Sequence, residues 1–268
     1  MRGINEVFIN DLLYGEISFF LEKVKMNPAL QIEVRKKYIN LYYRGGNLLR
    51  ITQKRNGYQF FFDVKYCLNK GNDANLELLN LLNSNNADDY IINFNLMITE
   101  MDSWLLVHPK AEREIQHNLS ISNNSVIDIE YQIKNLMRLD MLVYYEHTMF
   151  IVENKYGNGA ISGKAGIAKH YNDISNVLLD DVLREELIDS IVNISYAKHK
   201  LGLLDFSLNK KDIKNVGILF VFVNYNSKSI SISNEIKKID KLFPAKALFL
   251  DKDESLLEIS NAKDIFSL

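Results

Sequence analysis

Two acids and a lysine stand in a stretch that otherwise reads as buried strand. Asp140 interrupts the apolar run LDMLV, and Glu153 and Lys155 follow directly on the apolar residues 150–152. A buried charge is costly unless it is paired or bound to a metal. Successive strand side chains alternate between faces, so Glu153 and Lys155 point the same way. A hairpin about residues 146 and 147 would bring Asp140 to matching depth, and two carboxylates and one ammonium group would then meet at one end of a sheet.

This combination of side chains suits the chemistry of phosphate esters. Paired carboxylates hold a hard cation such as Mg²⁺, which can also bind phosphate. The cation lowers the pKa of a bound water and polarises a phosphoryl oxygen, and a lysine can orient that water or neutralise charge on the phosphate. We therefore expect Asp140 and Glu153 to be metal ligands for Mg²⁺, or Mn²⁺ in its place, and Lys155 to be catalytic. The alternative for either acid alone is an exposed strand end or a salt bridge.

A third acid is expected from the helix that contains KAEREIQHNL. Ile115 and Leu119 are its apolar residues, and Glu112 lies three positions before Ile115. Helix faces repeat every three or four residues. Glu112 is therefore predicted to share the buried face and to assist the site, while Glu114 groups with His117 on the solvated side.

The elements expected around these residues form an α/β arrangement. Strands are expected at residues 126–133, 139–145, 148–155, 216–224 and 246–250, and helices at 110–119, 167–179, 181–201 and 232–242. The segment GNGAISGKAG after the third of these strands reads as a glycine-rich loop. The order of helix, three strands, helix and strand predicts an α/β sandwich around a mixed sheet.

The front of the chain has a different pattern. Residues 4–26 read as one amphipathic helix that ends at Asn27 and Pro28. An antiparallel meander follows, because β-branched and aromatic runs are punctuated by a Gly-Gly pair and by an Asn-Gly pair, a strong hairpin signal. Its strands are expected at residues 37–43, 47–54 and 58–66. We divide the chain into an accessory module at 1–100 and a core at 101–268.

The meander is also strongly basic. Residues 31–70 hold nine basic residues and the two acids Glu33 and Asp63, which is a net charge of +7 against −9 for the rest of the chain. Basic groups track phosphates, and aromatic faces stack on unpaired bases. Arg44 and Arg50 are accordingly predicted to bind substrate. The alternative is that the aromatic residues form a buried sheet face and the basic residues decorate its edges.

The segment RLDMLVYYEHTMFIVENK resembles the core signature of the PD-(D/E)XK nuclease superfamily, which includes many restriction endonucleases, Holliday-junction resolvases and repair nucleases. In that pattern Asp140 matches the first acid, Glu153 the second acid and Lys155 the lysine. KAEREIQ is similar to the first-helix motif of archaeal resolvases, which implies a metal-site role for Glu112. The resemblance implies a restriction-endonuclease-like αβββαβ core over residues 110–224.

The sequence also departs from the family pattern. Leu139 replaces the proline that names the family, and Asn154 is polar where an apolar residue is more usual. Branches with the ENK form often carry a glutamine about a turn before a tyrosine on the second helix. Here the tyrosine is present, but Ile167 stands where the glutamine would fall. The residues of this helix that we expect to contact substrate are Lys169, His170 and Tyr171, and the alternative is a solvated helix face.

The amino-acid composition limits the classes of protein to which this chain could belong. An apolar content of 47% and a charged content of 25% are ordinary for a soluble globular chain of 268 residues. The single cysteine, Cys67, rules out an intramolecular disulfide and a cysteine-rich zinc site. We expect a cytoplasmic protein with no membrane partner, because no signal peptide is evident and acids interrupt the apolar segment 4–24.

These observations predict a metal-dependent nuclease acting on DNA or RNA, with an N-terminal module that grips the substrate. Two alternatives stay open. One is a non-catalytic nucleic-acid-binding protein that keeps the nuclease fold, and the other is a protein-interaction module. The sequence also leaves a homo-oligomer open.

Overall fold

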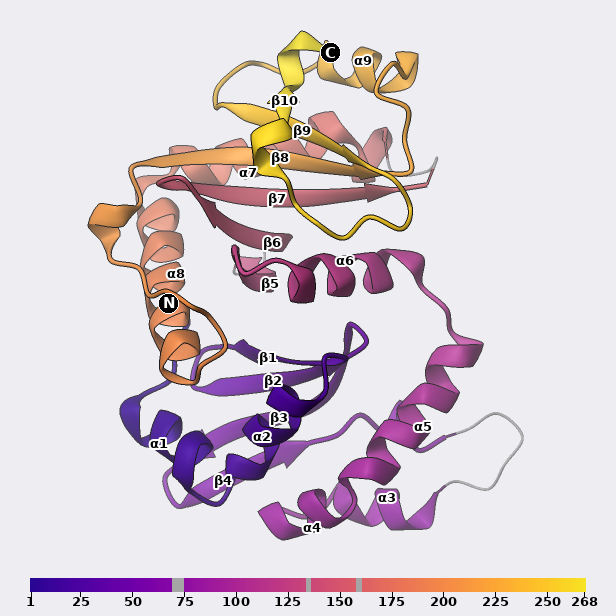
Figure 1. The fold of residues 1–268 in the computed structure, drawn as a ribbon, viewed down its shortest axis with the longest axis vertical. Coiled ribbons are helices and arrows are strands. Elements are labelled where there is room, and N and C mark those ends of the chain that lie inside the picture. The colour runs from indigo at the N-terminus through magenta and orange to yellow at the C-terminus, as the bar shows by residue number, and fades with distance from the viewer. Residues whose placement is uncertain (69–74, 134–135, 158–160) are drawn as a thin grey trace. The chain divides into compact units, whose positions relative to one another are not determined.

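The chain folds into an α/β structure with two sheets, one antiparallel and one mixed (Figure 1). The computed structural model describes all residues except 69–74, 134–135 and 158–160. One of the nine basic residues counted above, Lys70, lies outside the described residues. Within the described part of the chain, no helix has the length and apolar character that crossing a bilayer requires.

The contacts divide the chain into two units. The N-terminal unit comprises Arg2–Arg113 and Tyr196–Phe206, and the C-terminal unit comprises Met1, Glu114–Ser195 and Ser207–Leu268. The boundary expected at residue 100 falls inside helix α5 (Phe94–Val107), so the division comes later than the composition indicates. Residues 196–206 join the N-terminal unit through a buried ion pair, in which Lys198 Nζ lies 2.8 and 2.9 Å from the two carboxylate oxygens of Glu33.

The sheet of the N-terminal unit has four antiparallel strands in sequential order. They are β1 (Leu30–Val34), β2 (Tyr38–Tyr43), β3 (Gly46–Lys54) and β4 (Gly57–Phe61). The expected meander is confirmed, with Gly57 at a φ of 94° in the Asn-Gly turn. The first strand was not predicted, because Glu33 and Arg35 hide its short apolar alternation. The last strand ends earlier than expected, since the Asp63 side chain accepts a bond from the Lys65 N–H and starts the 3₁₀ turn Val64–Tyr66.

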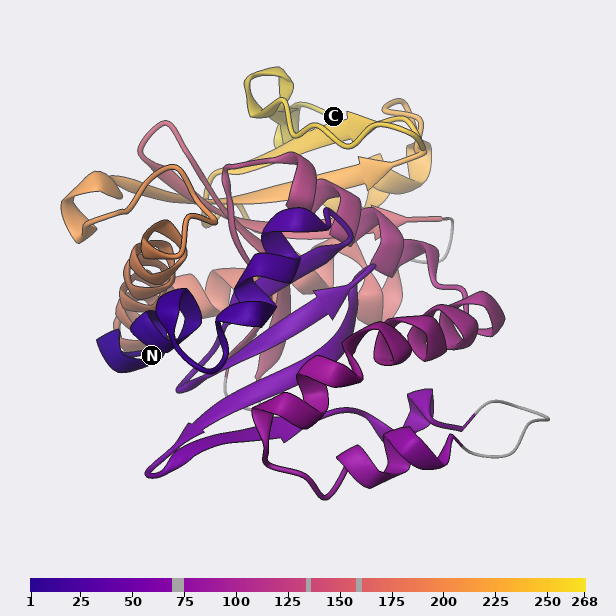
Figure 2. The ribbon, with the colours of Figure 1, turned by 60° about the horizontal axis from the view of Figure 1, so that its bottom comes forward.

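Helices cover the apolar face of this sheet (Figure 2). They are α1 (Glu6–Tyr14), α2 (Ser18–Met26), α3 (Leu76–Leu81), α4 (Ala87–Ile92) and α5. The single helix expected over 4–26 is wrong, because the chain breaks at Gly15, where a Cβ would lie 2.7 Å from the Asp11 Cα. Ring contacts join Phe20 to Phe60 and Phe94, and these contacts bind helices and sheet into one apolar core.

The C-terminal unit is built on a six-stranded mixed sheet in the order β10-β9-β8-β7-β6-β5. Its strands are β5 (Val126–Ile133), β6 (Met137–Tyr145), β7 (Thr148–Tyr156), β8 (Asn215–Val223), β9 (Ala245–Leu250) and β10 (Lys263–Asp264). β8 pairs in parallel with both β7 and β9, and the other pairs are antiparallel. Its near-continuous apolar run is buried as expected for a central parallel strand.

The helices of this unit follow the predicted order. They are α6 (Ala111–Ser122), α7 (Ile167–Leu179), α8 (Asp181–Lys200) and α9 (Ile230–Ile236). From α6 to β8 the chain therefore runs helix, three antiparallel strands, two helices, and a strand parallel to the third (Figure 1). The mixed sheet expected from the sequence is confirmed, and in it the hairpin β6–β7 lies between β8 and the edge strand β5.

Candidate active site

The hairpin β6–β7 sets the relative depth of the two acids. Its register pairs Met141 with Val152 and continues to Tyr145 and Thr148. The turn residues 146 and 147 both have left-handed backbone angles, with φ of 45° and 62°. This is the type of two-residue turn whose twist matches that of the strands. Asp140 and Glu153 are the next residues beyond the paired Met141 and Val152, so both stand at the same end of the hairpin.

Glu153 and Lys155 form a buried ion pair on one face of β7. Lys155 Nζ lies 2.8 Å from Glu153 Oε1, and both side chains are almost fully buried. The same Nζ donates a bond of 2.7 Å to the carbonyl of Ala165. Gly166 makes this turn possible, because a Cβ there would lie 2.7 Å from backbone atoms of Ser162. The lysine is thus held at two points before any ligand binds.

His170 of α7 also contacts Glu153. Its Nδ1 lies 3.1 Å from the same Oε1 that pairs with Lys155. Burial alone would raise the pKa of Glu153, but the bond with His170 and the positive charge of Lys155 outweigh it and hold that pKa below its ordinary value. Glu153 is therefore ionised at neutral pH.

The pKa of Asp140 is shifted in the opposite direction. Burial, followed by the charge of Glu153, raises the pKa of Asp140 to about 7, although the Asn154 N–H donates to its Oδ2 at 2.9 Å. Lys155 and His170 oppose the rise without cancelling it. A carboxyl whose pKa is raised by burial and by a second carboxylate is typical of a functional site, and a bound cation would relieve the repulsion between the two acids.

The donor atoms fit a hard divalent cation. Among the described residues no hydrogen bond engages Asp140 Oδ1 or Glu153 Oε2, because the bonds to these side chains go to Oδ2 and Oε1. Magnesium needs only one or two protein carboxylates when waters and phosphate complete its shell. In the described ranges there is no group of three or more His, Cys, Asp or Glu side chains placed to hold a metal. The carboxylates available at this end of the hairpin are those of Asp140 and Glu153.

The structure does not support the third acid. Glu112 is exposed, and the buried residues of α6 are His117, Leu119 and Ser120, so the predicted helix face is wrong at Glu112 and at His117. The buried face begins later along the helix than the apolar Ile115 indicated. Gln116, which was not predicted from the sequence, is the residue of α6 that reaches the site. Its Nε2 donates to the Asp140 carbonyl at 2.6 Å. Its position one turn after Glu112 was the available signal.

The residues of α7 that were expected to contact substrate lie in different environments. Tyr171 is fully buried, and its hydroxyl donates to the Phe243 carbonyl at 2.9 Å and accepts from the Phe243 N–H at 2.8 Å. The expectation that Tyr171 contacts substrate is therefore wrong, since its hydroxyl is already fully used. Lys169 is exposed and pairs with Asp173. Only His170 joins the cluster.

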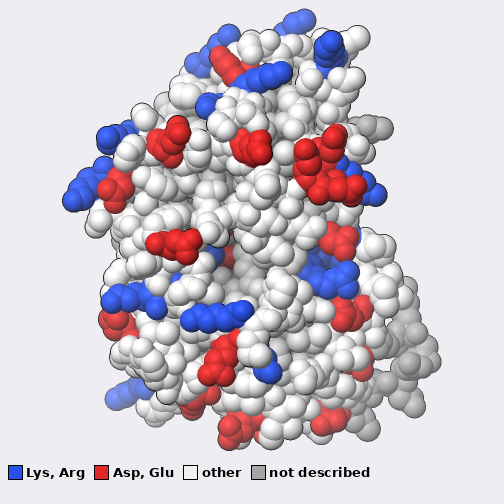
Figure 3. Space-filling view, in the orientation of Figure 1, with Lys and Arg blue, Asp and Glu red and all other residues white. Residues whose placement is uncertain are grey.

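In the basic meander the structure agrees mainly with the alternative prediction, in which the aromatic residues form a buried face of the sheet. Most of its aromatic side chains are buried in the core, and they are Tyr42, Tyr43, Tyr58, Phe60, Phe62 and Tyr66. Arg44 Nη1 lies 3.2 Å from Asp102. Arg50 differs, because its guanidinium carbon lies 4.9 Å from the Tyr38 ring centre and 5.6 Å from that of Phe61, and no described acid pairs with it. On the face seen in Figure 3, acidic and basic side chains are interspersed.

The comparisons with known proteins add no relative. No protein-family model, no curated protein and no solved structure matches this chain. Functional inference therefore depends on the cluster itself.

Proposed function

We propose that this protein is a metal-dependent nuclease that hydrolyses phosphodiester bonds of DNA, or of RNA, on a restriction-endonuclease-like core. The observation that carries the proposal is the cluster at the end of the β6–β7 hairpin. Two carboxylates there lie beside a buried lysine, and the charge of Glu153 contributes, after burial, to the raised pKa of Asp140. The order of elements from α6 to β8 supports the same fold assignment.

Each residue has a role that follows from its contacts. Asp140 Oδ1 and Glu153 Oε2 would hold Mg²⁺, which supplies a Lewis acid and an activated water when bound. Lys155, held by Glu153 and Ala165, presents a fixed positive charge to the phosphate or to the attacking water. His170 keeps Glu153 ionised and oriented. Gln116 positions the backbone of Asp140.

Substrate binding is assigned to Arg50 in the N-terminal unit. A guanidinium stacked on two aromatic rings and lacking an acidic partner among the described residues can contact phosphate without first breaking an ion pair. Arg44 would have to give up Asp102 to do the same.

A non-catalytic nucleic-acid-binding protein with this fold is the second candidate. It is favoured by the exposure of Glu112 and by the finding that no group of three or more possible metal ligands occurs among the described residues. Calorimetric titration with Mg²⁺ and Mn²⁺ separates the two candidates. Absence of metal binding together with intact, salt-sensitive oligonucleotide binding would favour the second.

The decisive experiment is cleavage of circular and linear, single- and double-stranded substrates with Mg²⁺, Mn²⁺ or EDTA. We expect metal-dependent cleavage by the wild type and none by Asp140→Asn or Lys155→Ala. Glu146→Gln is the matched control, because it removes an exposed acid from the turn of the same hairpin. Cleavage that persists in Asp140→Asn would refute the proposal.

A further inference from the structure

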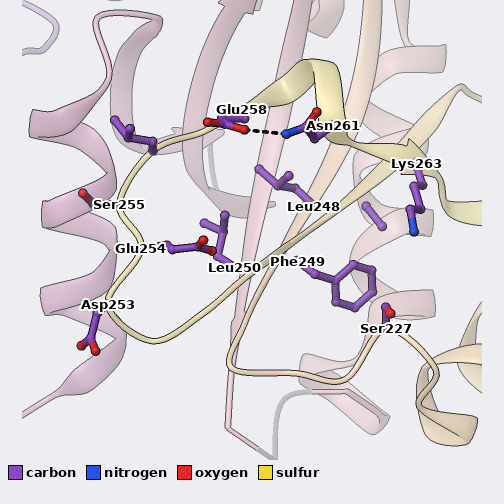
Figure 4. A pocket seen from close by; sticks show the side chains of 12 residues that line it. Ser227, Leu248, Phe249, Leu250, Asp253, Glu254, Ser255, Glu258, Asn261 and Lys263 are labelled. Carbon is purple, nitrogen blue, oxygen red and sulfur yellow. Dashed lines mark hydrogen bonds between the residues drawn. The ribbon is translucent and has the colours of Figure 1, made fainter.

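A groove runs along the outer edge of β9, within the C-terminal unit and apart from the acidic cluster of β6 and β7. Its cavity volume is about 500 Å³. Four consecutive residues, Ala247 to Leu250, line it together with the segment after β9 (Figure 4). Side chains of an extended strand alternate between faces, so consecutive residues can share one cavity only along the strand's edge.

The backbone on this edge is incomplete. β10 pairs only with Lys246 and Ala247, and no described strand pairs with residues 248–250 on that side. The Leu250 carbonyl accepts from the Asn224 N–H on the β8 side. By alternation, the N–H and carbonyl of Phe249 point outward into the groove. An unpaired strand edge is a template for another strand.

Asn123 keeps the following segment away from this edge. Its Nδ2 donates to the Ser255 carbonyl at 2.7 Å, and its Oδ1 accepts from the Leu257 N–H at 2.8 Å. These bonds tie residues 255–257 to the end of α6 instead of to β9. The segment therefore forms the opposite wall of the groove, and no described strand pairs with β9 beyond Ala247 on this side.

The charge of the groove walls indicates which kind of ligand could bind there. Three exposed acids, Asp253, Glu254 and Glu258, come from the segment, and Lys263 is the only cation among the lining residues (Figure 4). Leu256, which is exposed, adds apolar surface. We propose that this groove binds an extended peptide segment of a partner protein, rich in alternating basic and apolar residues, which adds as a strand beside Phe249 and continues the line of β10.

The test uses the whole protein and a fluorescent nonapeptide of alternating lysine and valine, with binding followed by anisotropy. The same peptide with N-methyl groups on alternate residues, in both registers, removes the donors that strand addition needs. We expect one methylated peptide to bind about tenfold more weakly and the other to bind like the parent, because only one set of alternate N–H groups faces β9. Binding of both methylated peptides with the affinity of the parent peptide would overturn the proposal.

Two protein variants complete the test. Glu254→Lys should weaken binding of the peptide, whereas Asp240→Lys, the same charge change at an exposed acid outside the groove, should leave it unaltered. Phe249→Pro removes the outward N–H, and circular dichroism checks that the sheet is kept. Equal effects of the two lysine variants would mean non-specific charge attraction. A concentration-dependent dimer that Phe249→Pro abolishes would mean that the edge binds a second copy. Either result contradicts the proposal.

Discussion

Lys155 Nζ lies 2.8 Å from Glu153 Oε1 on the same face of β7, and both side chains are buried. The two charges neutralise each other. Lys155 Nζ also donates to the Ala165 carbonyl, and His170 Nδ1 lies 3.1 Å from Glu153 Oε1. Asp140 stands beside this pair with no cationic partner of its own in direct contact among the described residues. This asymmetry explains why the pKa of Asp140 rises while that of Glu153 falls.

Replacing the lysine should destabilise the fold as well as stop cleavage. Lys155→Met leaves Glu153 buried with only His170 to balance it, and breaking a buried ion pair from one side costs about 3–5 kcal/mol. Urea denaturation at pH 7 measures the loss. The double variant Glu153→Gln, Lys155→Met removes both charges and should recover a large part of it. A stability loss in Lys155→Met below about 1 kcal/mol would contradict the buried pair.

Asp140→Asn should abolish cleavage and stabilise the protein at neutral pH. Below pH 4 the carboxyl is protonated in both folded and unfolded states, so it contributes nothing to pH dependence. Between pH 4 and about 7 the folded state keeps a proton that the unfolded state has lost, so the wild type loses stability as pH rises. The gain on substitution should therefore grow from pH 4 to pH 8, up to about 4 kcal/mol.

Thermal or urea unfolding of wild type and Asp140→Asn across this pH range measures the effect. Addition of Mg²⁺ at pH 8 should stabilise the wild type and not the variant, since a ligand stabilises only the state that binds it. A pH-independent difference between the two proteins would show that Asp140 is not perturbed in this way.

His170 should act through Glu153. His170→Phe removes the contact at 3.1 Å and lets the pKa of Glu153 rise. Loss of a residue that orients a metal ligand costs about 10–100-fold in metal affinity or activity. We expect a reduction of that size in Mg²⁺ affinity by calorimetry, accompanied by a similar loss of cleavage. Lys169→Gln, on the neighbouring exposed residue, is the control and should leave the Mg²⁺ affinity unchanged.

Asn154 offers a stabilising substitution. Both of its amide atoms are buried without a hydrogen-bond partner among the described residues, and only its backbone N–H serves the site, by donating to Asp140. Leaving buried polar groups unsatisfied costs about 1–3 kcal/mol. Asn154→Val should therefore raise the free energy of unfolding by about 1 kcal/mol and retain cleavage. A fall in unfolding free energy would instead reveal that the amide has a partner.

The two arginines predicted to bind substrate should behave differently. Arg50→Ala should weaken binding of an oligonucleotide and lower the salt dependence by about one counterion. Arg44→Ala should change binding less, because its guanidinium is already paired with Asp102. Fluorescence anisotropy over a range of salt concentrations measures both slopes. Identical slopes for Arg50→Ala and the wild type would remove Arg50 from the interface.

Local pattern was enough to predict much of this chain. Apolar runs and turn residues predicted β5, the β6–β7 hairpin, α7 and the central strand β8, because strand alternation and an Asn-Gly or two-residue turn depend on neighbouring residues alone. The spacing of Glu153 and Lys155 likewise settled that they share a face, and the register that aligns Asp140 with Glu153 follows from the turn.

Only the tertiary structure decided which long-range partners these residues meet. The exposure of Glu112, the capture of the Tyr171 hydroxyl by Phe243 and the contact of Gln116 with Asp140 all depend on how α6 and α7 pack, which no local periodicity encodes. The same holds for the ion pair between Glu33 and Lys198, whose residues are far apart in the chain. A buried polar group needs a hydrogen-bond or ion-pair partner. The packing of helices and strands, rather than the neighbouring sequence, decides which partner lies within reach.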